Sequence, residues 1–144
     1  MDHEAVRLLK AGRKIVDPIM EVHGFHWQPR GAGKSSGGFF DSGLYVKGDR
    51  NLELHFRFSL GLVNYHIGSI SLSHEQYMRH VAGKGQAQYP GFSDDPMDGF
   101  RHLADDLAKY CGDFLSGSGD EFKKAVTAAK ERDKLSGFQK LSSN

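Results

Sequence analysis

Residues 44–72, LYVKGDRNLELHFRFSLGLVNYHIGSISL, form the longest run of the chain with the alternation of β-strands. Apolar residues recur at every second position before the turn residues Gly48-Asp49-Arg50 and again after them. A second turn is expected at Leu60-Gly61, where a glycine interrupts the alternation. The stretch predicts a three-stranded antiparallel meander, and residues 25–28 are a candidate fourth strand.

The sequence on both sides of this stretch has the apolar spacing of helices. Residues 2–23 repeat apolar side chains at steps of three and four, which predicts an N-terminal helix. Ser73, Asp95-Pro96 and Ser118 are capping signals for three later helices. We therefore predict an α+β fold, an antiparallel β-meander of three to four strands with an N-terminal helix and C-terminal helices packed on one face.

The length of 144 residues predicts a single domain over residues 1–144. Glycine and serine are concentrated at about 30–38, where we expect a flexible loop. The C-terminus is expected to fray from about residue 134.

Composition excludes several classes of function. The formal net charge of +1 gives no general attraction to nucleic acid or to a membrane surface, so neither is an expected partner. No window is apolar enough for a membrane span, and the charged start MDHEAVRLLKAG is not typical of a signal peptide. One cysteine, Cys111, cannot form an intrachain disulfide, which agrees with an expected cytoplasmic location.

Three features of the sequence suggest a reactive or binding site, and each has a simpler explanation. Gly31-Ala32-Gly33-Lys34-Ser35 lacks the earlier glycine of a phosphate-binding loop, since Gln28 occupies that position. The eight histidines have no His-Glu-x-x-His pair, and a single cysteine cannot build a thiolate site, so we predict no metal and no cofactor. Cys111 falls on the apolar stripe of a predicted helix, as a buried small side chain would.

The strand register predicts one polar face. A three-residue loop at residues 48–50 pairs Val46 with Leu52 and Leu44 with Leu54, which keeps one face apolar. Facing side chains on the other side, about 4.5–5.5 Å apart at Cβ, are then expected as a His55–His66 pair, an Asp41–Arg57 pair and a Tyr45–Glu53 pair. The predicted ligand-binding residues on this face are Asp41, Glu53, His55, Arg57, Asn64 and His66.

This polar face has two readings. An antiparallel sheet commonly presents one side to solvent, and polar residues there need no further role. Alternatively, Arg57 holds an anionic group beside coupled histidines, in a small-ligand-binding protein or an enzyme.

Three stretches carry a family resemblance: Phe58-Ser59-Leu60-Gly61, residues 71–75 (SLSHE) and residues 89–96 (YPGFSDDP). With the order of elements, they resemble small bacterial α+β proteins of unassigned function and, more loosely, immunity proteins of contact-dependent toxin systems. The resemblance implies a non-enzymatic protein-binding role, immunity- or adaptor-like, with a protein partner or a homodimer. Exposed aromatic and acidic residues near the third helix are the predicted partner surface: Tyr89, Phe92, Asp94 and Asp98.

Overall fold

The computed structural model describes residues 3–35, 37–83 and 95–142, without the side chains of residues 136–142. Five strands are flanked by an N-terminal helix and by the later helices, as the α+β prediction requires. In chain order the elements are α1 (Glu4–Val22), β1 (His26–Ser35), β2 (Gly38–Lys47), β3 (Arg50–Phe56), β4 (Leu60–Ile67), β5 (Ile70–Ser73), α2 (His74–Val81), α3 (Asp98–Tyr110), α4 (Gly112–Leu115) and α5 (Asp120–Ser142). The helical backbone of α5 continues past residue 134, where fraying was predicted.

The sheet is a five-stranded antiparallel meander with the order β1-β2-β3-β4-β5. The sequence predicted three to four strands and missed β5. This short strand pairs with β4 through a two-residue turn, Gly68-Ser69, in which Gly68 has a φ of 58°. Glycine tolerates that left-handed conformation, and primed hairpin turns place it at this position.

The predicted loop at about 30–38 is wrong for residues 30–35 and 38, which belong to β1 and β2. Glycine and serine suggested a loop, but the β1 backbone pairs with β2 as far as Ser35 opposite Gly38. The ladder shifts between Pro29 and Gly31, where proline provides no N–H donor. The hydrogen bonds between β1 and β2 therefore stabilise a strand in a segment whose glycine and serine content favours a loop.

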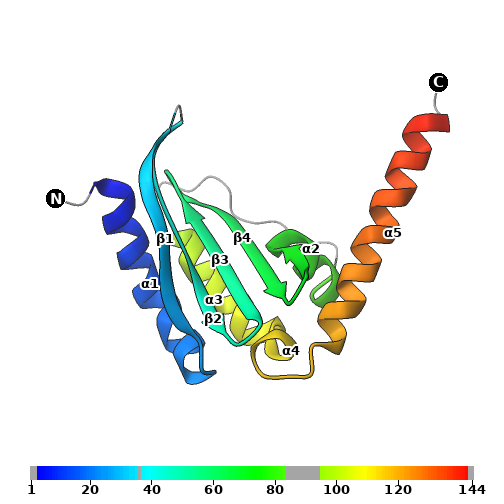
Figure 1. Cartoon of the computed structure of the whole chain (residues 1–144), viewed down its shortest axis with the longest axis horizontal. Coiled ribbons are helices and arrows are strands. Elements are labelled where there is room, and N and C mark those ends of the chain that lie inside the picture. The colour runs from blue at the N-terminus through cyan, green and yellow to red at the C-terminus, as the bar shows by residue number, and fades with distance from the viewer. Residues whose placement is uncertain (1–2, 36, 84–94, 143–144) are drawn as a thin grey trace.

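One side of the sheet, hereafter the helix side, packs on the helices and forms the core. In Figure 1, α3 lies behind the sheet and α1 runs along its β1–β2 portion, while α2 and α5 stand at the β5 edge. The largest fully buried side chains from sheet and helices are Tyr45, Tyr65, Tyr77, Phe56, Phe100, Phe114 and Phe122. α1 and α3 approach closely because Gly12 has no side chain, and a Cβ there would lie 2.3 Å from the Phe100 ring.

The β2–β3 hairpin is anchored to the chain around α4 by Arg50. The guanidinium donates from Nη1 to the carbonyls of Asp113 (3.1 Å) and Phe114 (2.8 Å), and from Nη2 to that of Gly117 (2.7 Å). These donors satisfy carbonyls near the end of α4. Arg50 therefore fixes the end of the hairpin to the segment around α4. The register of the hairpin decides which of its residues face outward.

Candidate functional site

The β2–β3 register differs from the prediction by one residue. Lys47 faces Arg50 across a two-residue turn, Gly48-Asp49, with a φ of 58° at Gly48, so the predicted three-residue loop is wrong. Tyr45 therefore faces Leu52, and Gly43 faces Leu54. A one-residue slip exchanges the two faces of a strand, so every β2 side chain lies opposite to its predicted side.

Tyr45 and Gly43 explain why this register is favoured. The buried Tyr45 ring packs edge-on against Trp27, at a centroid distance of 4.9 Å, and its hydroxyl donates to Asp17 Oδ1 at 2.6 Å. A Cβ on Gly43 would lie 2.2 Å from the Trp27 ring, so glycine provides the space that the indole fills. The packing of Tyr45 and Gly43 against Trp27 therefore favours the observed register over the one in which Leu44 and Val46 would be buried.

The β3–β4 pairing is also displaced, but by an even number of residues, so the predicted faces hold. Leu52 faces Tyr65 and Leu54 faces Val63, whereas the predicted turn at Leu60-Gly61, with His55 opposite His66, would place Leu54 opposite Ile67. The turn comes earlier than predicted, because Leu60 is buried and faces Phe56. The side chains of Leu52, Leu54 and Tyr65 still face the core.

The side of the sheet away from the helices is defined here as the open face. None of its side chains is buried, and no described helix packs against it. Its cross-strand rows are His26, Val46, Asn51, His66 and Ser71; Gln28, Leu44, Glu53, Asn64 and Ser73; and Ser42, His55 and Leu62. Phe40 belongs to the same face, since its ring stacks on His55 at a centroid distance of 5.4 Å.

The structure brings together only some of the predicted ligand-binding residues. Glu53, Asn64 and His66 adjoin one another, with His66 Nε2 3.1 Å from Glu53 Oε1. His55 shares their face but pairs with Leu62, so the predicted His55–His66 pair does not form. The displaced β3–β4 register separates the two histidines.

Arg57 and Asp41 do not form the predicted ion pair. Arg57 Nη2 donates to Ser35 Oγ at 2.7 Å, beside the β1–β2 hairpin end. Asp41 faces Phe56 in the ladder and lies on the helix side of the sheet. Whether any of these six residues binds a ligand stays a prediction.

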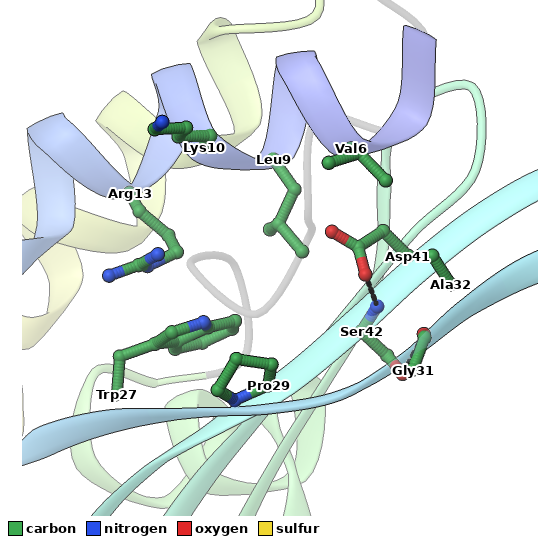
Figure 2. Close-up of a pocket in the computed structure, with 10 residues that line it drawn as sticks. All are labelled: Val6, Leu9, Lys10, Arg13, Trp27, Pro29, Gly31, Ala32, Asp41 and Ser42. Carbon is green, nitrogen blue, oxygen red and sulfur yellow. Dashed lines mark hydrogen bonds between the residues drawn. The ribbon is translucent and has the colours of Figure 1, made fainter. Parts of the chain in front are cut away.

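Asp41 lines a pocket of about 350 Å³ between α1 and the β1–β2 hairpin. Figure 2 shows Arg13 at one end, Asp41 at the other, and Leu9 between them above Trp27 and Pro29. The Arg13 guanidinium stacks over the Trp27 ring at 4.4 Å from its centroid. Such a pocket combines apolar walls with charged groups of opposite sign, a combination used to orient small ligands.

At the Arg13 end of the pocket, polar contacts connect Arg13 through Asp17 to the buried Tyr45. Arg13 Nη2 lies 3.5 Å from Asp17 Oδ2, and Asp17 also accepts the Tyr45 hydroxyl bond. Burial, together with this bond to Asp17, holds the pKa of Tyr45 well above its ordinary value. Arg13 Nε is buried without a hydrogen-bond partner among the described residues.

A second polar centre, hereafter the His–Asp centre, consists of His74, His102 and Asp106. His74 and Asp106 are buried, and His74 Nε2 lies 2.8 Å from Asp106 Oδ2. His102 Nε2 approaches the same carboxylate oxygen at 3.1 Å, and its side chain is 35% exposed. On the other side of His74, Nδ1 lies 2.8 Å from the Tyr65 hydroxyl.

The Tyr65 hydroxyl extends this network to Cys111, whose Sγ lies 3.7 Å away. Burial raises the pKa of Cys111 to about 12, and burial also raises the pKa of Tyr65. The thiol is fully buried, as the sequence predicted for a core residue. Neither group is poised to ionise at neutral pH.

No short sequence motif marks the His–Asp centre, so it was not among the predicted sites. His74 and Asp106 are separated by 32 positions, and only the packing of α2 on α3 brings them together. One feature of the sequence does point to a buried polar contact in this helix. Asp106 sits on the apolar stripe of its helix, three residues after Leu103 and beside Leu107, where a buried carboxylate needs a partner.

Of the predicted partner surface, only Asp98 falls within the described residues. Tyr89, Phe92 and Asp94 lie outside them. Asp98 begins α3 and accepts a bond from Arg101 Nη1 at 2.6 Å.

No protein-family model, curated protein or solved structure matches this chain. The resemblance to toxin-immunity proteins therefore stays a prediction. No helix in the part of the chain that the structure describes is long and apolar enough to cross a membrane.

Proposed function

We propose that this chain is a non-enzymatic binding protein that engages a partner protein through the open face. The supporting observation is the β2–β3 register, which turns Leu44 and Val46 away from the core, on the side where Phe40 stacks on His55. A strand with solvent on one side ordinarily presents polar residues there. Apolar residues in that position are available for contact with a partner, and a cluster of them is typical of an interaction surface.

The composition of the open face fits a protein interface. Its apolar residues Phe40, Leu44, Val46 and Leu62 are partly exposed, Leu62 by 40%. Glu53, His55 and His66 border them with hydrogen-bonding and charged groups. Interfaces between separately folded proteins combine an apolar centre with a polar border in this way.

An immunity- or adaptor-like role, implied by the sequence resemblance, is the form of binding we propose. Such a protein acts by covering its partner and needs no catalytic group. A cytoplasmic location in a bacterium completes the proposal, and the single buried thiol supports a reducing compartment.

Site-specific photo-cross-linking in cells that naturally produce this protein tests the proposal. A photoreactive residue at Leu62 should give an adduct with a separate protein, and one at Lys109, 59% exposed on α3, should not. Leu44→Asp should abolish the Leu62 adduct. Val22→Asp, which charges a 77% exposed apolar residue outside the open face, should leave it intact.

Three outcomes would contradict this proposal. The same adducts from Leu62 and Lys109 would mean unspecific contact. The second outcome is the absence of any adduct from Leu62, and the third is an adduct from Leu62 only with a second copy of the chain. The last result would replace the separate partner with a homodimer.

A second candidate function is the binding of a small ligand in the α1–β1–β2 pocket. The specific observation is the placement of Arg13 and Asp41 at opposite ends of a slot floored by Trp27 (Figure 2). This arrangement suits a ligand with an anionic end, a short apolar middle and a cationic end. Short ω-amino acids have this chemistry and are suitable probes.

Trp27 is the only tryptophan of the chain, so its fluorescence reports binding directly. Titration with short ω-amino acids should change the fluorescence saturably, and Arg13→Gln or Asp41→Asn should weaken the response. Lys14→Gln, on the same helix but outside the pocket lining, is the control. An unchanged fluorescence in the original protein would reject this candidate.

A further inference from the structure

The His–Asp centre presents three metal-ligating side chains at one point of the fold. His74 is the first residue of α2, while His102 and Asp106 stand four residues apart on α3. This spacing places the latter two on the same helix surface. One ligand atom from each of the three residues lies within 4.8 Å of the others.

We propose that His74, His102 and Asp106 bind a divalent transition-metal ion such as Zn²⁺. Two imidazole nitrogens and one carboxylate oxygen are a ligand set that proteins use for zinc and for related metals. Both Nε2 atoms already converge on Asp106 Oδ2, at 2.8 and 3.1 Å. Tetrahedral ligands at zinc bond lengths stand about 3.3 Å apart, so both histidine nitrogens lie within about 0.5 Å of the spacing to Asp106 Oδ2 that an ion requires.

The surroundings of His74 support this proposal. Ligating histidines ordinarily bond through their second ring nitrogen to an oxygen, which fixes the ring and its tautomer. His74 does so through Nδ1, 2.8 Å from the Tyr65 hydroxyl. With the proton on Nδ1, the tautomer that donates to the Tyr65 hydroxyl, His74 turns an Nε2 lone pair toward Asp106 Oδ2, and a cation bound by both atoms would relieve their repulsion.

Burial of the centre is asymmetric in a way that suits metal entry. His74 and Asp106 have almost no exposed surface, whereas the His102 side chain is 35% exposed. An ion can therefore reach the ligands from the His102 side. Residues with little access to water hold their geometry before the ion arrives, which lowers the cost of binding.

The competing explanation is a metal-free hydrogen-bond network, in which the Tyr65 hydroxyl donates to His74 Nδ1 and His74 Nε2–H donates to Asp106. The two explanations differ in the cobalt spectrum of the protein. Co²⁺ in a site of low symmetry with nitrogen and oxygen ligands gives visible d–d absorption bands, and a hydrogen-bond network gives none. Calorimetric titration with Zn²⁺ measures stoichiometry and affinity independently.

The experiment uses the full chain after chelator treatment, with His102→Ala as the principal variant because this residue is partly exposed. We expect one Zn²⁺ per chain, a visible Co²⁺ spectrum, and loss of both in His102→Ala and Asp106→Asn. Tyr65→Phe should weaken Zn²⁺ binding about 10–100-fold, as removal of a supporting hydrogen bond does. Circular dichroism should confirm that each variant is folded.

His80→Ala is the matched control, since His80 lies on α2 and pairs with Glu121 at 3.3 Å, outside the centre. Its Zn²⁺ affinity should equal that of the original chain. Absence of Zn²⁺ binding by the original chain would overturn the proposal. Unchanged binding in His102→Ala would also overturn it, because the ion would then occupy other histidines, such as those of the open face.

Discussion

His74 Nε2 lies 2.8 Å from Asp106 Oδ2 in the core, and this contact joins α2 to α3 across 32 positions of sequence. The neighbouring carboxylate, Asp105, points outward and pairs with Lys109 at 2.9 Å with 57% of its side chain exposed. Two adjacent aspartates thus have opposite environments. They form a natural pair for testing what the buried contact contributes.

Asp106→Ala should destabilise the fold by about 1–3 kcal/mol, because without metal it removes the acceptor of the His74 Nε2–H bond and leaves that buried donor unsatisfied. Asp105→Ala should change stability by no more than about 0.5 kcal/mol, as exposed ion pairs contribute little. Urea unfolding in chelator-containing buffer measures both. Equal effects of the two substitutions would show that the buried contact contributes no more to the free energy of unfolding than the exposed ion pair does.

Gly43→Ala should destabilise the fold by about 1–3 kcal/mol through overpacking. The added Cβ would lie 2.2 Å from the Trp27 ring and would force the indole away from Tyr45. Gly31→Ala is the control, since nothing lies within 4 Å of a Cβ at that position. Trp27 emission should shift in the first variant alone, and an unshifted spectrum would argue against this packing.

Cys111 should not react with a disulfide reagent at about pH 8 while the protein is folded, because only its thiolate attacks. Burial raises the pKa of the thiol to about 12 and also blocks access. In denaturant the same thiol should react readily. Rapid labelling of the native protein would contradict the burial of this side chain.

Alkaline pH should weaken the fold. Tyr45, Tyr65 and Tyr77 have pKa values raised above the ordinary 10.0, chiefly because burial disfavours the phenolate. Above pH 10.0 the unfolded chain therefore loses phenol protons that the folded chain keeps, and stability decreases as pH rises. At about pH 11 the tyrosinate absorbance of the folded protein should stay below that of the unfolded protein, and equal absorbances would contradict this account.

Fold class was predictable because apolar periodicity is a property of whole segments. The spacing in residues 2–23 and the alternation after Arg50 were sufficient for the N-terminal helix and for the inward faces of β3 and β4. Register was harder, because it depends on one residue of turn length. Gly48-Asp49 and Gly48-Asp49-Arg50 are both reasonable loops, and only Tyr45 packing beside Trp27 distinguishes them.

The candidate sites were less predictable than the fold, since each depends on tertiary contacts. The sequence predicted correctly that Glu53, Asn64 and His66 share the polar face. It placed Asp41 on the wrong side of the sheet, because the predicted β2–β3 register differs from the observed one by one residue. The pocket requires α1 to pack against β1. No pattern within either segment specifies that contact.

The proposed interface depends on the β2–β3 register, which nuclear Overhauser contacts between backbone protons of the isotope-labelled protein measure directly. We expect contacts that pair Tyr45 with Leu52 and Leu44 with Glu53, which leave Leu44 and Val46 on the open face. Contacts that pair Leu44 with Leu54 and Val46 with Leu52 would instead turn these aliphatic residues into the core. That result would contradict the open face and the function proposed for it.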